Sequence, residues 1–261
     1  MRPGKEIDSA IITAYSLVLN DEPIPRFQND VYILLPRALS KVMNHFKENY
    51  IDLSTNKVHS VDPFKSDEYL NMVNSNKLIT HRYIFTPVLF SGHWWIYVLD
   101  KVKKSFFVID SRPKEDPGPE RTKINKFAGN LINQLLVRAG YQSLLTKATK
   151  TKPEQRSWLP KYIKIREQPN PFDCGTFVMK WMEVLDPTKL AANKKYEIED
   201  WTTEKLEEFR NEIISAIILS KSNKLIEGAI QGAMETTIHK PSAALQNSYV
   251  QVTTEELEKL G

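Results

Sequence analysis

Hydrophobic positions along the chain follow two periods, and the first of them is helical. Near the start, an apolar stripe has helical spacing, with Asp8 or Ser9 available as the N-cap. Pro23 and Pro25 end this helix. The stripe consists of Ile7, Ile11, Tyr15, Val18 and Leu19. A second, shorter amphipathic helix is predicted over residues 63–74. The early part of the chain is therefore predicted to be helical.

The period changes to that of β-strands in the next part of the chain. Three runs of aromatic and β-branched residues have the length of strands, at 83–90, 94–99 and 105–109. The polar break at 100–104 predicts that the second and third runs form a hairpin.

Helical spacing returns after these strands. Pro119 opens a long helix that Gly140 terminates, and two further helices are predicted over residues 175–185 and 204–220. Residues 161–166 alternate like an edge strand. Because helices flank a central group of strands, the predicted fold class is α+β.

The apolar periodicity decays from about residue 223, where Gly, Ser, Thr and Gln accumulate. The chain has 261 residues, of which 41% are hydrophobic and 26% charged, and this composition excludes wholesale disorder. The sequence therefore predicts one folded domain over residues 1–222, followed by a loosely held tail over residues 223–261.

Charge and hydropathy exclude several functions. The 36 Lys and Arg against 32 Asp and Glu leave a net charge of +4, which is too small to indicate nucleic-acid binding. No apolar run approaches the roughly 20 residues that cross a bilayer, and Glu6 and Asp8 interrupt any secretory signal. No pair of histidines has a metal-binding spacing. We therefore expect no nucleic-acid or membrane partner, no metal and no cofactor.

Cys174 is the only cysteine, so a disulfide within the chain is excluded and a reducing compartment is expected. A lone cysteine is more often a small buried hydrophobic residue than a reactive one. Its neighbours favour reactivity, because Pro169 and Pro171 disfavour helix before it and residues 175–185 favour helix after it. Exposed amides and the macrodipole at a helix N-terminus stabilise a thiolate, so Cys174 is the candidate nucleophile.

A thiol nucleophile needs a base and a group that orients the base. His93 begins the strand predicted at 94–99, and Asp110 ends the strand predicted at 105–109. If Leu99 pairs with Lys104, His93 lies opposite Asp110, with Cα atoms roughly 4.5 to 5.5 Å apart. Asp100 would lie on the order of 23 Å from His93 and cannot compete. The alternative is that His93 and Asp110 form a surface pair at a sheet end.

Gln168 is a fourth candidate. It stands six residues before Cys174, and its side-chain amide can donate to a developing oxyanion beside the Cys174 backbone N–H. A glutamine in a loop does not by itself indicate a function. Together with His93 as base and Asp110 as orienting acceptor, it completes the parts of a thiol protease.

The combination His93-Trp94, Asp110-Ser111 and residues 168–175 resembles the ubiquitin-like-protein-specific cysteine proteases, the sentrin/SUMO-protease (Ulp) family. The resemblance extends over roughly residues 7–220. It implies a papain-like core in which helices flank a central mixed sheet, with the catalytic residues in the permuted order His, Asp, Cys. It also implies that Trp94 binds substrate by lining a narrow tunnel for a Gly-Gly tail.

The resemblance implies a thiol isopeptidase that cuts after the C-terminal Gly-Gly of a ubiquitin-like modifier. A SUMO-type protein is the first expectation, in conjugates or as a precursor, and a monomer in the nucleus or cytoplasm is expected. The alternatives are a protease for another modifier such as NEDD8, an acyl transferase on the same fold, or a silent domain that only binds a ubiquitin-like protein. One departure concerns Glu6, which stands where family members often have a tryptophan that clamps the tail.

Overall fold

The structure is a computed structural model that describes residues 6–39, 51–52, 57–58, 72–112, 118–144, 160–192, 194–221 and 223. The chain divides into two units, Met1–Ile217 and Ile218–Gly261. The first unit contains the whole five-stranded sheet. Most of the predicted tail lies outside the described residues, so its loose packing stays a prediction.

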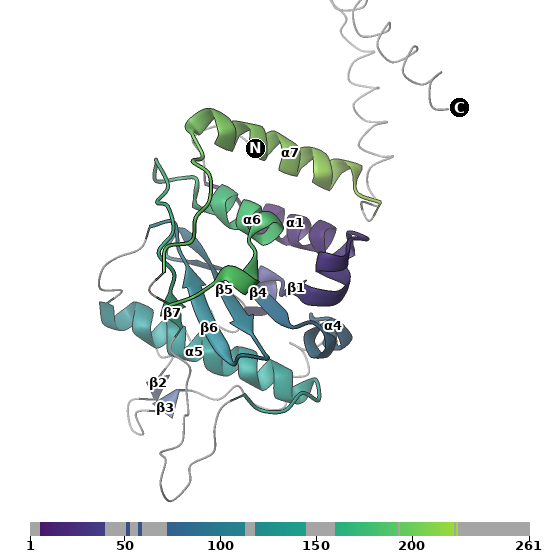
Figure 1. The fold of residues 1–261 in the computed structure, drawn as a ribbon, viewed down its shortest axis with the longest axis vertical. Coiled ribbons are helices and arrows are strands. Elements are labelled where there is room, and N and C mark those ends of the chain that lie inside the picture. The colour runs from purple at the N-terminus through teal and green to yellow at the C-terminus, as the bar shows by residue number, and fades with distance from the viewer. Residues whose placement is uncertain are drawn as a thin grey trace, which may run out of the picture. The chain divides into compact units, whose positions relative to one another are not determined.

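In the described part of the chain, five strands form one sheet with the order β1-β4-β5-β6-β7 (Figure 1). The strands are β1 Val31–Ile33, β4 Tyr83–Phe90, β5 His93–Asp100, β6 Ser105–Ile109 and β7 Lys161–Tyr162. The two outer pairs are parallel and the two inner pairs antiparallel, so the sheet is mixed as predicted. Two further short strands, β2 Ile51–Asp52 and β3 Lys57–Val58, form a separate antiparallel pair.

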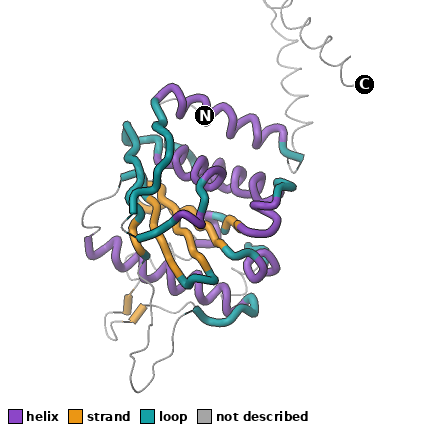
Figure 2. The backbone as a smooth tube through the Cα atoms, viewed as in Figure 1, coloured by secondary structure: helices purple, strands orange, loops and turns teal. Residues whose placement is uncertain are grey.

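Helices cover both faces of the sheet, which confirms the α+β class (Figures 1 and 2). One face carries α1 Ser9–Asp21, α6 Cys174–Val184 and α7 Thr203–Leu219. The other carries α4 Ser75–Thr80 and the long α5 Gly118–Arg138. There are also two short helical turns, η1 Arg26–Asp30 and η2 Pro187–Lys189. No helix of the described residues is long and apolar enough to span a membrane.

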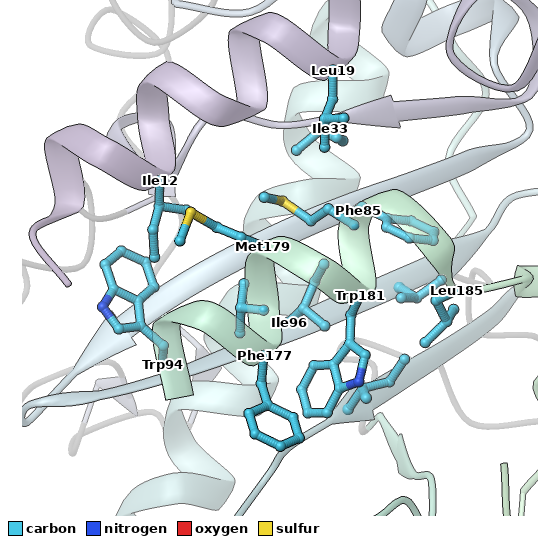
Figure 3. Close-up of a cluster of buried hydrophobic side chains, with 14 of the residues drawn as sticks. Ile12, Leu19, Ile33, Phe85, Trp94, Ile96, Phe177, Met179, Trp181 and Leu185 are labelled. Carbon is cyan, nitrogen blue, oxygen red and sulfur yellow. The ribbon is translucent and has the colours of Figure 1, made fainter. Parts of the chain in front are cut away.

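The central strand β5 supplies side chains to both hydrophobic cores, because successive residues of a strand point to opposite faces. Trp94 and Ile96 point toward α1 and α6, where they meet Ile12 and Phe177 (Figure 3). The intervening Trp95 belongs to the core beneath α5. This double burial explains why the strand is apolar at nearly every position.

Helix bounds follow the signals in the sequence. Asp8 caps α1, with its Oδ1 accepting the Ala10 N–H at 2.7 Å. Gly140, which follows α5, has φ +97°, a conformation that glycine adopts without strain. One detail differs, because Ile12 rather than Ile11 lies fully in the core. The helix predicted over residues 63–74 lies, apart from its last three residues, outside the described residues.

The predicted register of the β5–β6 hairpin was wrong by two residues. The prediction placed His93 directly opposite Asp110, whereas the structure pairs Asp100 with Ser105 and carries that register along the hairpin. A slip of two residues keeps every side chain on its original face, whereas a slip of one would reverse the faces. The prediction of which side chains share a face of the sheet is therefore correct, although the register was not.

The turn explains the observed register. Asp100 Oδ1 accepts the backbone N–H groups of Val102 and Lys103, each at 3.0 Å. Lys104 has φ +49°, which closes the turn. Because Asp100 anchors the turn from within the strand, pairing continues to this residue instead of stopping at Leu99.

Candidate active site

His93 and Asp110 meet at the end of β5 and β6 that lies away from the turn. His93 Nε2 is 2.6 Å from Asp110 Oδ1. In the observed register residue 110 falls opposite Trp95, so His93 is its diagonal neighbour on the same face. A diagonal neighbour is within reach of a long side chain, which is why the two groups still meet. The hydrogen bond leaves Nδ1 as the ring nitrogen available to a third group.

Asp110 is 4% exposed, and both of its oxygens have further donors. The Arg112 backbone N–H donates to Oδ1 at 2.9 Å, and Arg121 Nη2 donates to Oδ2 at 3.0 Å. Burial favours the neutral acid, but His93, Arg121 and the Arg112 amide together lower the pKa of Asp110. Asp110 is therefore a fixed, ionised acceptor for the imidazole.

Arg121 was missed by the sequence reasoning. It lies on α5, where its guanidinium carbon stands 3.2 Å from the centre of the Trp95 ring while Nη2 reaches Asp110. The Trp95 ring is in turn 6.1 Å from the His93 ring. One signal could have found it: Arg121 stands three residues before Ile124, on the inward stripe of an amphipathic helix. A charge at that position needs a buried partner.

Cys174 is the first residue of α6 and is 1% exposed, so its predicted place at a helix N-terminus is confirmed. His93 Nδ1, the ring nitrogen not used by Asp110, is buried and has no protein acceptor or donor of good geometry among the described residues. Burial lowers the pKa of His93, but the hydrogen bond and charge of Asp110, together with the nearby Cys174, outweigh it and raise the pKa to about 9. A base close to a thiol at the start of a helix is the arrangement that a thiol nucleophile needs, and the catalytic roles of the two residues stay a prediction.

Gln168 lies in the loop before α6, and the structure brings it beside the residue that follows Asp110. Its backbone N–H donates to the Ser111 carbonyl at 2.9 Å. Its side-chain Oε1 accepts from Ser111 Oγ at 2.6 Å, and its Nε2 donates to the Asn170 carbonyl. The glutamine is thus anchored in the neighbourhood of the His93–Asp110 pair. Its role toward an oxyanion stays a prediction.

The N-terminal segment crosses the same region. Trp94 is 2% exposed, and its indole N–H donates to the Ile7 carbonyl at 3.3 Å. Ile7 also lies against the start of α6, where a Cβ added to Gly175 would come within 2.9 Å of the Ile7 Cβ. Glu6 is exposed, and its carboxylate reaches Gly92, one residue before His93. The tunnel-lining role of Trp94 stays a prediction.

A cavity of about 550 Å³ opens beside His93 and Asp110 on the α5 side of the sheet. Its walls include Trp95, Arg121 and Tyr162. Neither Cys174 nor Gln168 lines it, so it is not the space in front of the thiol. Within the described ranges, no group of three His, Cys, Asp or Glu side chains is placed to hold a metal ion.

A comparison with models of known protein families gave a match over most of the chain. The sequence model of the Ulp1 protease family, C-terminal catalytic domain, matches residues 25–220. A comparison with curated proteins gave no match.

Solved structures similar to this chain include SUMO protease Ulp1 with its catalytic cysteine oxidised to a sulfinic acid, at 13% identity over 82% of this chain and 78% of that one, with a TM-score of 0.49. The C-terminal Ulp1 protease domain in complex with Smt3, the yeast orthologue of SUMO, has 14% identity over 81% and 76%, with a TM-score of 0.46. The Chaetomium thermophilum Ulp1-like SUMO protease catalytic domain has 16% identity over 82% and 72%, with a TM-score of 0.43.

Proposed function

The chain belongs to the Ulp1 protease family, a family of cysteine peptidases, and from this we propose that it is a thiol isopeptidase acting after the C-terminal Gly-Gly of a ubiquitin-like modifier. The observation that carries the proposal is the contact between His93 and Asp110 at 2.6 Å, together with Cys174 at the start of α6. We expect the enzyme to act as a monomer in the nucleus or cytoplasm, where reducing conditions preserve a thiolate.

The first half of the proposed reaction forms a thioester. The Cys174 thiolate attacks the carbonyl carbon of the terminal glycine, and the electron pair of the C=O bond moves to oxygen. When this pair returns, the C–N bond breaks and the His93 imidazolium gives its proton to the leaving amine. Asp110 stays ionised throughout and stabilises the imidazolium.

The second half regenerates the enzyme. The neutral imidazole of His93 accepts a proton from water, and the resulting hydroxide attacks the thioester carbonyl. The C–S bond breaks, which releases the modifier with a free carboxylate and returns Cys174 as a thiolate. The backbone N–H of Cys174, one of the unpaired amides at the start of α6, and the Gln168 amide would stabilise both oxyanions.

A SUMO-type protein is our first choice of substrate, because the His93-Trp94 and Gln168-to-Gly175 motifs resemble SUMO proteases. A tunnel beside Trp94 would admit a tail without side chains, so the folded body of the modifier must supply the specificity. Glu6 stands at the apparent clamp position. We expect Glu6→Trp to speed capture of the modifier.

Covalent capture tests the substrate. SUMO, NEDD8 and ubiquitin, each carrying a C-terminal electrophile, are incubated with the wild-type chain and with Cys174→Ala as the control. We expect SUMO to label fastest and the alanine variant to remain unlabelled. Equal labelling by ubiquitin would overturn the SUMO preference. An absence of labelling by any probe, with intact binding, would favour a silent binding domain.

Acyl transfer is the other chemistry open to this site. A thioester at Cys174 can react with an amine as well as with water, so the two activities differ only in the acceptor. Turnover of a modifier amide in the presence of a free lysine derivative separates them. We expect the free carboxylate as the main product, and a predominant lysine adduct would favour an acyl transferase.

A further inference from the structure

Ser111 makes two contacts with Gln168, one through its backbone and one through its side chain. Its carbonyl accepts the Gln168 N–H at 2.9 Å, and its hydroxyl donates to Gln168 Oε1 at 2.6 Å. Ser111 is 0% exposed, so water does not compete for this hydroxyl. It follows Asp110 directly in the chain. One buried residue therefore connects the end of the β6 strand to the loop before α6.

The carboxamide of Gln168 has one orientation that satisfies both neighbours. The Asn170 carbonyl can only accept, so the amide nitrogen must face it. The amide oxygen then faces Ser111, whose hydroxyl supplies a proton. A carboxamide nitrogen carries two hydrogens, and Asn170 takes one. Across the described part of the chain no second acceptor meets this nitrogen, which leaves one N–H to donate.

We propose that Ser111 is a positioning residue that holds the Gln168 carboxamide with its remaining N–H directed to the oxyanion of the acyl-transfer step. The inference rests on the proposed function, and it gives a role to a buried residue whose hydroxyl bonds to Gln168. Ser111 acts only through Gln168. Its removal leaves the carboxamide held only at the Asn170 carbonyl, so the amide oxygen is no longer fixed and the remaining N–H loses its set direction.

The rest of the loop is fixed independently of Ser111. Asn170 Nδ2 donates to Asp173 Oδ2, and Asp173 Oδ1 accepts from Arg210 Nη2 of α7 at 2.5 Å. Asp173 and Arg210 are both buried. Because this ion pair holds the loop next to Cys174, loss of the Ser111 hydroxyl should leave the backbone in place. The effect should therefore be confined to the side chain of Gln168.

Nuclear magnetic resonance of the full chain tests the contact without any substrate. The side-chain NH₂ signals of Gln168 are assigned by their loss in Gln168→Ala. We expect them to be well separated in the wild type and to move closer together in Ser111→Ala, toward the values of a free glutamine side chain. Unchanged signals in Ser111→Ala would overturn the proposal.

Kinetics test the consequence, with the modifier that labels best supplied as its C-terminal aminomethylcoumarin amide. We expect Gln168→Ala to lower kcat on the order of 10² to 10³, as for other oxyanion donors. Ser111→Ala should lower kcat roughly tenfold with KM unchanged, since a mobile donor is weakened and not removed. In the Gln168→Ala background, Ser111→Ala should have less than about a twofold effect, because the residue it positions is absent.

Two variants control for a merely structural effect. Ser111→Thr keeps the hydroxyl and should keep most of kcat, provided that its thermal midpoint shows a folded chain. Ser16→Ala removes another fully buried hydroxyl, one that bonds to the Ile12 carbonyl within α1, and should leave kcat unchanged.

The outcomes separate the two proposals. Ser111→Ala could lower kcat equally in the wild type and in the Gln168→Ala variant. This result would show that Ser111 acts on the fold or on Asp110, and it would overturn the positioning role. An effect of Gln168→Ala confined to KM would assign Gln168 to substrate binding and would overturn it too. If no modifier is turned over, the proposed function fails, and the resonance measurement alone decides whether Ser111 holds Gln168.

Discussion

The β5–β6 hairpin carries a buried aspartate at each end, and the two invite comparison. Asp100, at the turn, accepts a bidentate pair of hydrogen bonds from Arg82 at 2.9 and 3.2 Å and two more from turn amides. Asp110, at the open end, accepts from Arg121, a backbone amide and His93. Both carboxylates are surrounded by an arginine and backbone N–H groups.

The pKa of each aspartate lies below its ordinary value for similar reasons. Burial favours the neutral acid in both, and the neighbouring donors outweigh it: chiefly Arg82 for Asp100, and chiefly His93 for Asp110. The difference lies in the partner. An arginine keeps its proton at any ordinary pH, whereas an imidazole can release one. A buried, ionised aspartate at a strand end therefore does not by itself indicate a catalytic role. It does so only when it is hydrogen-bonded to a group that can gain and lose a proton.

Removal of the proposed nucleophile, Cys174, should abolish the reaction proposed for the open end of the hairpin. We expect Cys174→Ala to lower kcat on the order of 10⁵ or more, because losing the nucleophile of a catalytic triad has this scale of effect. The thermal midpoint should stay close to that of the wild type. Release of amine from a modifier amide measures turnover, and a rate within tenfold of wild type would refute the protease assignment.

Matched substitutions at the two aspartates test the comparison directly. Asp110→Asn should lower kcat very roughly 10⁴-fold, as in an analogous triad, because the imidazolium loses its orienting anion. Asp100→Asn should lower the thermal midpoint and change kcat less than about threefold. Steady-state kinetics and thermal unfolding of both variants provide the measurement. Similar losses of kcat at the two positions would show that the aspartates act alike on the fold.

Titration of His93 sharpens the comparison further. Its pKa of about 9 lies above the ordinary value, so the imidazolium is present through neutral pH and is lost as the pH rises through about 9. The stability that this charge contributes is complete below about pH 6.5 and is lost over the same rise. Activity that depends on the imidazolium should fall on this alkaline side.

The midpoint can be measured from the imidazole resonances. We expect the pKa of His93 to fall in Asp110→Asn and in Cys174→Ala, since each removes a group that raises it. His81 is a control within the same chain, because burial lowers its pKa and neither substitution touches its partners. A wild-type midpoint for His93 near 6.5 would contradict the described pair.

The smallest effect is expected from removal of the predicted tail. A chain that ends at residue 222 should fold and keep its activity within about twofold, because the sequence beyond it lacks the apolar periodicity of the core elements. Soluble expression, thermal unfolding and turnover of the shortened chain check this. Loss of soluble protein would show that the tail is part of the folded domain.

Much of the fold could be predicted because its signals are local. The strands at 83–90 and 105–109 have the predicted bounds, since aromatic and β-branched runs between polar breaks leave little ambiguity. The place of Cys174 at the start of a helix followed from the prolines before it and the apolar run after it. These features require only a few neighbouring residues.

The features that could not be predicted depend on residues far apart or on very short segments. Strand β1 has three residues, Val31–Ile33, and pairs with β4 about 50 residues later in the chain, so no local period shows it. The hairpin register depended on how Asp100 and Lys104 shape the turn. Arg121 and Ser111 gain their roles only when helix α5 and the loop before α6 are brought to the end of β6.

The buried ion pair between Asp173 and Arg210 has a consequence for how the enzyme is made. Protein synthesis releases His93, Asp110 and Cys174 from the ribosome before it releases Arg210, yet the loop beside the thiol is held by that last residue. Domains generally fold as units during translation. We therefore expect a nascent chain that already contains every candidate catalytic residue to remain inactive until α7 has emerged. The order of translation would then delay proteolysis until the whole catalytic domain has been made.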